Sequence, residues 1–178
     1  MPRQGNLFGQ LVSYCVTMRT HPAVTALCLT AALAIGGCRA REVEKDLKIT
    51  DVETGWFDAG IVEGQNKIVP TVTFRIQNVS QEAIDDVQIN AIFRRNNEPE
   101  AWGDRLVSGV GDDGLAPGAT GRPLVVRSER GYTGTEPRLQ MLKNSQFVDA
   151  KVELFGKHGS RTWVKMAEFP ISRDLITD

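Results

Sequence analysis

The fold is decided by residues 71–77, whose sequence TVTFRIQ alternates polar and apolar side chains. The apolar members are Val72, Phe74 and Ile76. A two-residue period is typical of a β-strand that buries one face and exposes the other. We therefore expect these three side chains to point into a hydrophobic core. The polar side chains between them should point away from it, because a buried polar group without a partner is costly.

The same alternation occurs in two further stretches, residues 87–93 (VQINAIF) and residues 148–154 (VDAKVEL). Weaker strand patterns cover four more segments: Leu47–Phe57, Arg105–Val110, Arg122–Arg127 and Arg161–Ile171. Turn-forming residues separate these segments, and residues 156–160 (GKHGS) are typical of a hairpin loop. About seven short strands joined by frequent turns predict an all-β fold, an immunoglobulin-like antiparallel β-sandwich.

One short helix is expected to interrupt the strands. Thr135 is a suitable N-terminal cap and Pro137 suits the first turn. Leu139 and Leu142 would share one face of the helix, and Asn144 would end it. We therefore expect a single short helix within an otherwise all-β domain.

The first 37 residues differ from the rest because they contain no Asp or Glu. Arg3 and Arg19 precede an apolar run, residues 23–35, which is too short for a comfortable membrane span. A positive front followed by such a run is typical of an export signal. Since the positive region of a signal is normally short, we expect translation to begin at Met18; a genuine long leader is the alternative.

The apolar run ends in Ile35, Gly36, Gly37 and Cys38. This order of a branched apolar residue, two small residues and a cysteine resembles the lipobox of bacterial lipoproteins. The resemblance implies cleavage before Cys38 and attachment of lipid to its thiol and to the new amino terminus. Several acyl chains would then anchor the protein firmly in a membrane. An ordinary secretory signal with an incidental cysteine is the alternative.

The chain thus divides into a signal peptide (1–37), a lipidated tether with little structure of its own (38–48) and a β-sandwich domain (49–178). No second cysteine follows Cys38, so the exported domain is expected to lack an intramolecular disulfide. Arg39 stands where many inner-membrane lipoproteins carry aspartate. The sorting rule of that family implies the periplasmic face of the outer membrane in a cell with two membranes.

Motifs for catalysis or metal binding are missing from the sequence after the leader. Its single histidine, His158, lies in an expected loop and is not accompanied by a nucleophile elbow. A zinc site needs several His or Cys ligands. The net charge of -1 gives no reason to expect a nucleic-acid partner. We therefore expect a protein without enzymatic activity, metal ion or cofactor.

A set of arginines around Tyr132 is the first candidate for a binding surface. Its members lie in and beside a long segment between strands: Arg122, Arg127, Arg130 and Arg138. Guanidinium groups suit phosphate or carboxylate partners, and loops between strands often carry function. The alternative is that these arginines are ordinary solvated side chains.

Aromatic residues form the second candidate. Trp56, Phe57 and Trp102 lie near expected loops, where an exposed pair would indicate a site for a partner. Trp163 lies within a strand pattern and is therefore expected in the core. The sequence leaves open whether the first three are exposed or buried.

Three short stretches resemble the FxLYD-type and related immunoglobulin-like envelope domains: residues 75–80 (RIQNVS), 84–89 (IDDVQI) and 115–118 (LAPG). The resemblance implies an exported accessory or binding domain without catalytic residues. We therefore expect a lipoprotein that is anchored to a membrane and acts as a non-catalytic binding module in the cell envelope, with an envelope protein or another ligand as partner. The alternatives are a structural accessory subunit of an envelope transport or secretion complex and, more distantly, an unrecognised enzyme.

Overall fold

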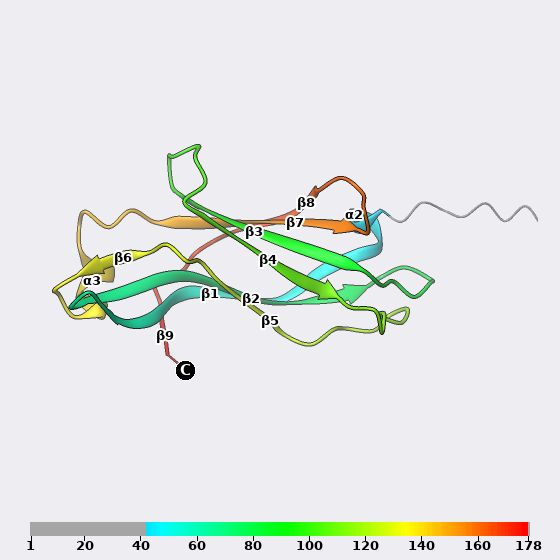
Figure 1. The fold of residues 1–178 in the computed structure, drawn as a ribbon, viewed down its shortest axis with the longest axis horizontal. Coiled ribbons are helices and arrows are strands. Elements are labelled where there is room, and N and C mark those ends of the chain that lie inside the picture. The colour runs from blue at the N-terminus through cyan, green and yellow to red at the C-terminus, as the bar shows by residue number, and fades with distance from the viewer. Residues whose placement is uncertain (1–41, 178) are drawn as a thin grey trace, which may run out of the picture. The chain divides into compact units, whose positions relative to one another are not determined.

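The computed structural model describes residues 42–177, which form a β-sandwich of two sheets (Figure 1). The expected all-β fold is thereby confirmed. The expected signal peptide, the lipobox residues Ile35, Gly36 and Gly37, and the expected lipidation site Cys38 lie outside the described residues.

The first sheet has the strand order β5-β2-β1-β9, with β6 also paired to β2. Its strands are β1 (Leu47–Val62), β2 (Gln65–Asn78), β5 (Leu124–Arg127), β6 (Tyr132–Gly134) and β9 (Leu175–Ile176). All pairs in this sheet are antiparallel except β1 with β9, which is parallel. The β1–β2 hairpin is the longest feature of the domain, and the other strands are added along its two edges.

The second sheet has the strand order β4-β3-β7-β8 and is antiparallel throughout. Its strands are β3 (Val87–Arg95), β4 (Gly103–Val110), β7 (Ala150–His158) and β8 (Val164–Pro170). The pairing of β3 with β7 runs without a register shift from Val87 opposite His158 to Arg95 opposite Ala150. This pair forms the regular centre of the second sheet.

The core lies between the two sheets and follows the two-residue period. Val72, Phe74 and Ile76 are at most 1% exposed, as expected. The alternate residues of β3 are buried completely: Val87, Ile89, Ala91 and Phe93. Thr71 departs from the alternation, because it is also buried, and its hydroxyl donates to the carbonyl of Val69 at 3.3 Å. That hydrogen bond offsets the cost of burying the hydroxyl.

The expected number of strands is too low, because the described residues form nine rather than about seven. Strands β6 and β9 have three and two residues, which is too short for a periodic pattern. The third expected strand begins at Ala150 rather than Val148, so Val148 remains 36% exposed. The expected hairpin loop is shifted to residues 159–163, since β7 continues to His158 and β8 begins at Val164.

The expected tether is wrong for the residues that the structure describes. Val43–Asp46 form a short helix, α2, and Leu47 and Lys48 already belong to β1. Val43 and Leu47 are each only 5% exposed and belong to the core. Two apolar side chains among charged neighbours were too sparse to show a period, but their burial brings this segment into the domain.

The expected helix is present as α3 (Arg138–Lys143), and Asn144 follows its last residue. Two details of the expectation are wrong. Pro137 occupies the cap position, with no side-chain hydrogen bond, so Thr135 does not cap the helix. Met141 and Leu142 are buried while Leu139 is 55% exposed, so the buried side chains of this short helix come from its C-terminal half.

The β1–β2 hairpin ends in a tight turn whose central residues, Glu63 and Gly64, have φ of 51° and 77°. Two left-handed central residues match the right-handed twist of paired strands. Figure 1 shows this turn, β6 and α3 together at one end of the sandwich, here called the distal end. Helix α2 and the β7–β8 loop lie at the opposite end, here called the N-terminal end.

Candidate functional site

Four aromatic rings fill the space between the sheets toward the distal end. Trp56 of β1 lies at the centre of this aromatic cluster, with ring centroids 4.8 Å from Phe147, 5.6 Å from Tyr132 and 6.1 Å from Trp102. Tyr132 also contacts Trp102 and Phe147, at 4.9 Å and 4.8 Å. The pairs are tilted or edge-to-face, which is the preferred geometry for aromatic rings.

The cluster settles where the expected aromatic residues lie. Trp56 is fully buried, and Trp102 is half-buried against the core, so they form no exposed pair. Phe57 points to the other face of β1, where the Arg127 guanidinium lies 3.5 Å above its ring centroid. Trp163 is 37% exposed and precedes β8, so its expected place in the core is wrong. The strand that it was expected to join begins one residue later.

Phe147 is the member of the cluster that the sequence did not identify. The pattern of residues 148–154 predicted that Val148 faces the core. A turn in which the Phe147 amide donates to the Asn144 carbonyl at 3.1 Å instead turns Phe147 inward. The turn residues Asn144 and Ser145 were the only local signal that the strand starts later.

Strand β6 reaches its place in the cluster because Gly131 precedes it. A Cβ at position 131 would lie 2.0 Å from the Ile68 carbonyl oxygen, so only glycine allows β6 to approach β2 this closely. Tyr132 then pairs with Ile68 and directs its ring inward. Its hydroxyl donates to the carbonyl of Val148 at 3.1 Å. This bond fixes the segment before β7 against β6.

Two arginines border the aromatic cluster. The Arg95 guanidinium lies 5.5 Å from the ring centroid of Trp102, and that of Arg173 lies 5.1 Å from Phe147. Arg173 also pairs with Asp149 at 2.6 Å. Burial raises the pKa of the Tyr132 phenol, and this effect exceeds the opposing influence of the nearby Arg95 guanidinium. Tyr132 therefore stays uncharged and acts as a hydrogen-bond donor.

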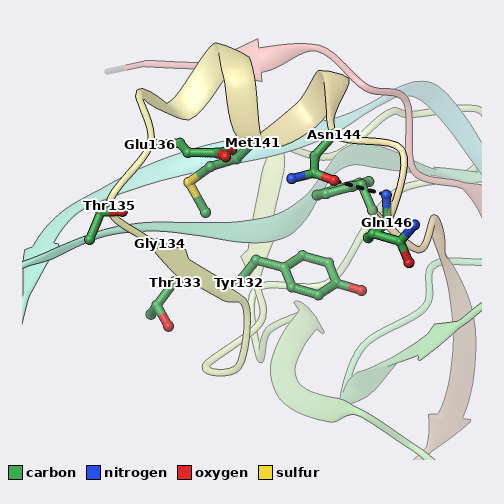
Figure 2. Close-up of a pocket in the computed structure, with 9 residues that line it drawn as sticks. Tyr132, Thr133, Gly134, Thr135, Glu136, Met141, Asn144 and Gln146 are labelled. Carbon is green, nitrogen blue, oxygen red and sulfur yellow. Dashed lines mark hydrogen bonds between the residues drawn. The ribbon is translucent and has the colours of Figure 1, made fainter.

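A cleft of about 290 Å³ opens beside the cluster, between β6 and the segment that runs from α3 to β7. It is lined by Tyr132, Thr133, Gly134, Thr135, Glu136, Met141, Asn144, Gln146 and Phe147. Figure 2 shows Met141 descending from α3 toward β6, and the Tyr132 ring below the loop that carries Asn144 and Gln146. The Asn144 side-chain oxygen accepts a hydrogen bond from the backbone amide of Gln146 at 2.9 Å.

The lining gives the cleft an apolar floor and a polar rim. Two rings and the Met141 thioether form the floor, while hydroxyl and amide groups stand at the rim. Glu136 is the one carboxylate among the lining residues, and no Lys or Arg is among them. Such a site suits an uncharged group with an apolar body, because a few polar groups then fix its orientation.

The structure places the candidate arginines at different positions. Arg122 is exposed on the segment before β5, and Arg130 is exposed before β6. Arg127 stacks on Phe57, and Arg138 of α3 pairs with Asp58 of β1. Only Tyr132 of the candidate set lines the cleft. A binding role for the arginines stays a prediction, whereas the stretch around Tyr132 does form a concave site.

A separate group of charges crosses the outer face of the second sheet. Glu153 of β7 accepts hydrogen bonds from Arg94 Nε and Lys165 Nζ, each at 2.8 Å. Glu168 of β8 joins the group through Lys165 and Lys151, at 2.6 Å and 3.1 Å. The hydrogen bonds from Arg94 and Lys165 lower the pKa of Glu153 to about 2, against the opposing effect of its burial. Glu153 therefore remains ionised well below neutral pH.

The described residues contain neither a candidate metal site nor a candidate membrane-spanning helix. Within residues 42–177, no group of three or more His, Cys, Asp or Glu side chains is placed to hold a metal ion. Over the same range, no helix is long and apolar enough to cross a membrane.

No protein-family model and no curated protein matches the chain. Among solved structures, target SoR45 of the Northeast Structural Genomics Consortium is 12% identical, with a TM-score of 0.42, over 74% of this chain and 89% of that one. A Bordetella pertussis protein with the provisional name ApaA is 20% identical, with a TM-score of 0.39, over 72% and 94%. Likenesses this distant carry no conclusion about function, and the resemblance to FxLYD-type domains stays a prediction.

Proposed function

We propose that this chain is an exported lipoprotein, anchored through Cys38, that acts as a non-catalytic binding module in the cell envelope. The observation that carries the proposal is the short distance in sequence between the lipobox and the folded domain. The lipobox ends at Cys38, and Val43 is already buried in the core. A lipid on Cys38 would therefore hold the sandwich itself close to a membrane. In a cell with two membranes, we propose that this is the periplasmic face of the outer membrane.

Binding is supported by the cleft at the distal end. It combines an apolar floor with hydroxyl and amide groups, which is the usual composition of a site that binds a ligand. Its walls come from β6 and α3, and they are held by backbone pairing and by the aromatic cluster behind them. A site on such supports changes shape little when a ligand binds.

A structural accessory subunit of an envelope transport or secretion complex is the second candidate. It is favoured by exposed apolar side chains at the distal end, such as Leu139, which is 55% exposed. Large apolar patches are typical of permanent interfaces. The two candidates differ in the lifetime of the contact with the partner. A subunit would remain bound to its complex when the membrane is solubilised, whereas a binding module would bind and release its partner.

Replacement of Cys38 tests the anchor. We expect Cys38→Ser to fold normally, because the residue precedes the domain. The variant should leave the membrane fraction, because it has no thiol to which the lipid could be attached. Cys28→Ser is the matched control, since it changes a cysteine in the expected signal and should remain bound. Fractionation after a carbonate wash, with mass spectrometry of the processed amino terminus, gives the result. A Cys38→Ser protein that stays in the membrane would refute the lipoprotein proposal.

A further inference from the structure

We infer that the distal end docks a protein segment that inserts a bulky apolar side chain, aromatic or aliphatic, into the cleft beside Tyr132. The inference rests on the proposed function and names the class of partner for that same site. The partner would be an envelope protein in the aqueous compartment, and the contact would be governed by apolar surface rather than by charge.

Exposed apolar side chains are frequent at the distal end, although none of them lines the cleft itself. Eight large hydrophobic residues are at least 36% exposed in the described part of the chain, and four of them lie at the distal end. These four are Ile61 at 72%, Val62 at 39%, Leu139 at 55% and Val148 at 36%. The others are Val79, Leu106, Val125 and Trp163, which lie on other elements. A cleft with an apolar floor, at an end of the sandwich that exposes further apolar side chains, is typical of a site for an anchor residue of a protein partner.

Contacts between the hairpin and α3 show where Ile61 lies relative to the helix, whereas Val62, the next residue of β1, points to the opposite face. Asn66 donates from its side-chain amide to the Glu136 carbonyl at 2.8 Å, and Arg138 pairs with Asp58. Ile61 is the cross-strand partner of Asn66, so both side chains lie on the same face of the hairpin. Since Asn66 reaches the segment before α3, Ile61 lies on the side of the hairpin that faces this helix.

Two arginines near the cleft are paired within the protein, whereas the exposed Glu136 lines the cleft itself. Arg138 is held by Asp58, and Arg173 is held by Asp149 and by the carbonyls of Leu142 and Phe147. These guanidinium groups would have to give up their partners to bind a phosphate or a carboxylate. Since the lining also holds the Glu136 carboxylate and no Lys or Arg, the cleft disfavours a negatively charged group on the partner.

The size of the cleft and the position of the anchor favour a protein over a lipid surface. A volume of about 290 Å³ is at the lower end for a small-molecule pocket and suits one or two side chains. Residues 38–41 can extend over at most roughly 14 Å. Strand β1, with 16 residues, runs from the N-terminal end to the distal end over roughly 50 Å. A membrane held by Cys38 would therefore lie nearer the N-terminal end than the cleft.

The test is selection from a random peptide library displayed on phage, against the full chain extracted from membranes in detergent. We expect the selected peptides to share one aromatic or large aliphatic residue. Gly134→Val should weaken their binding at least about tenfold, because the Cβ at this position points toward Met141, at 3.5 Å from its Cε, and the added methyl groups enter the cleft. Leu139→Ser should also weaken binding, and it changes only an exposed side chain.

Leu106→Ser is the matched control, because Leu106 is 56% exposed and lies on β4, away from the cleft. It should leave binding within about twofold. The inference is overturned if no peptide is enriched, if the selected peptides share only charged residues, or if both cleft variants bind as well as the control. Failure of the lipoprotein proposal would show separately, in the membrane fractionation of Cys38→Ser.

A lipid partner is tested with the same chain. Cys38→Ser protein is sedimented with vesicles of phosphatidylethanolamine and phosphatidylglycerol, and we expect it to stay in the supernatant. Sedimentation with the vesicles that is abolished by Ile61→Ser would show that the hairpin inserts into lipid. That result would overturn the inference of a protein partner.

Discussion

The middle of the sandwich and its distal end are both built from apolar side chains, but they are covered to different degrees. In the middle, Phe74 of the first sheet and Phe93 of the second sheet each point toward the opposite sheet and are fully buried. At the distal end, Phe147 is half-buried beside an open cleft, and Leu139 is 55% exposed. The difference indicates that the middle supplies most of the stability, whereas the distal end retains apolar surface that a partner can cover.

The largest effect is expected in the middle. Phe74→Ala should lower the free energy of unfolding by about 3–5 kcal/mol, the usual range for emptying a buried Phe site. The neighbouring Arg75→Ala should cost about 1 kcal/mol or less. The Arg75 side chain is 38% exposed, donates to the Gly121 carbonyl at 2.9 Å and lies 3.6 Å from the exposed Asp51 carboxylate, so the substitution removes one partly exposed hydrogen bond and one exposed ion pair. Denaturant melts compare the two, and equal losses would mean that the core strand is misassigned.

The next largest effect is a loss of folding stability at acidic pH. The folded-state pKa of Glu153 is about 2, below its unfolded value near 4.5. A lowered carboxyl pKa stabilises the fold above the unfolded value, and this contribution is lost as the pH falls from about 4.5 to about 2. The loss should reach up to about 3 kcal/mol, at about 1.4 kcal/mol for each pKa unit.

Glu153→Gln should remove that part of the acid sensitivity. Its unfolding free energy should be lower than that of the parent at pH 7, and the difference should shrink toward pH 2. Glu129→Gln is the control, because its side chain is 73% exposed. Denaturant melts at several pH values give the comparison. Parallel stability profiles for the parent and Glu153→Gln would show that the charge group does not hold this carboxyl ionised.

The smallest effect is expected at the distal end. Phe147→Ala should lower the free energy of unfolding by about 1–2 kcal/mol, since a half-buried ring loses less apolar contact than a buried one. The same melts that measure Phe74→Ala measure this variant. A loss as large as that of Phe74→Ala would place the distal end within the main core. That result would argue against an apolar surface at the distal end that stays exposed in the free protein.

The sequence predicted the middle of the molecule well and its ends poorly. Residues 71–77 and 87–93 show a two-residue period because both strands bury one face along their whole length. Strand β6 and helix α2 are too short to show any period. Their positions depend on contacts with distant strands, such as the approach of Gly131 to Ile68.

The candidate site was predicted in part. The sequence singled out the stretch around Tyr132, which does line the cleft, but it attributed the binding to arginines. Arg138 is held by Asp58, and Arg127 stacks on Phe57. Those partners lie far away in the sequence, so a local pattern could not show that the guanidinium groups are engaged. Phe147 was missed for the related reason that a single turn reverses which residue faces inward.

The central claim is that the distal end is open in the free protein and covered where the protein works. Leu139→Cys and Leu106→Cys test it most directly, since their exposures are nearly equal and a lipidated Cys38 has no free thiol. Both variants are labelled with N-ethylmaleimide, as purified protein and in the cells that naturally produce it. Equal labelling of the purified variants, with protection only of position 139 in cells, is the result predicted. Equal labelling of both positions in cells would contradict the account.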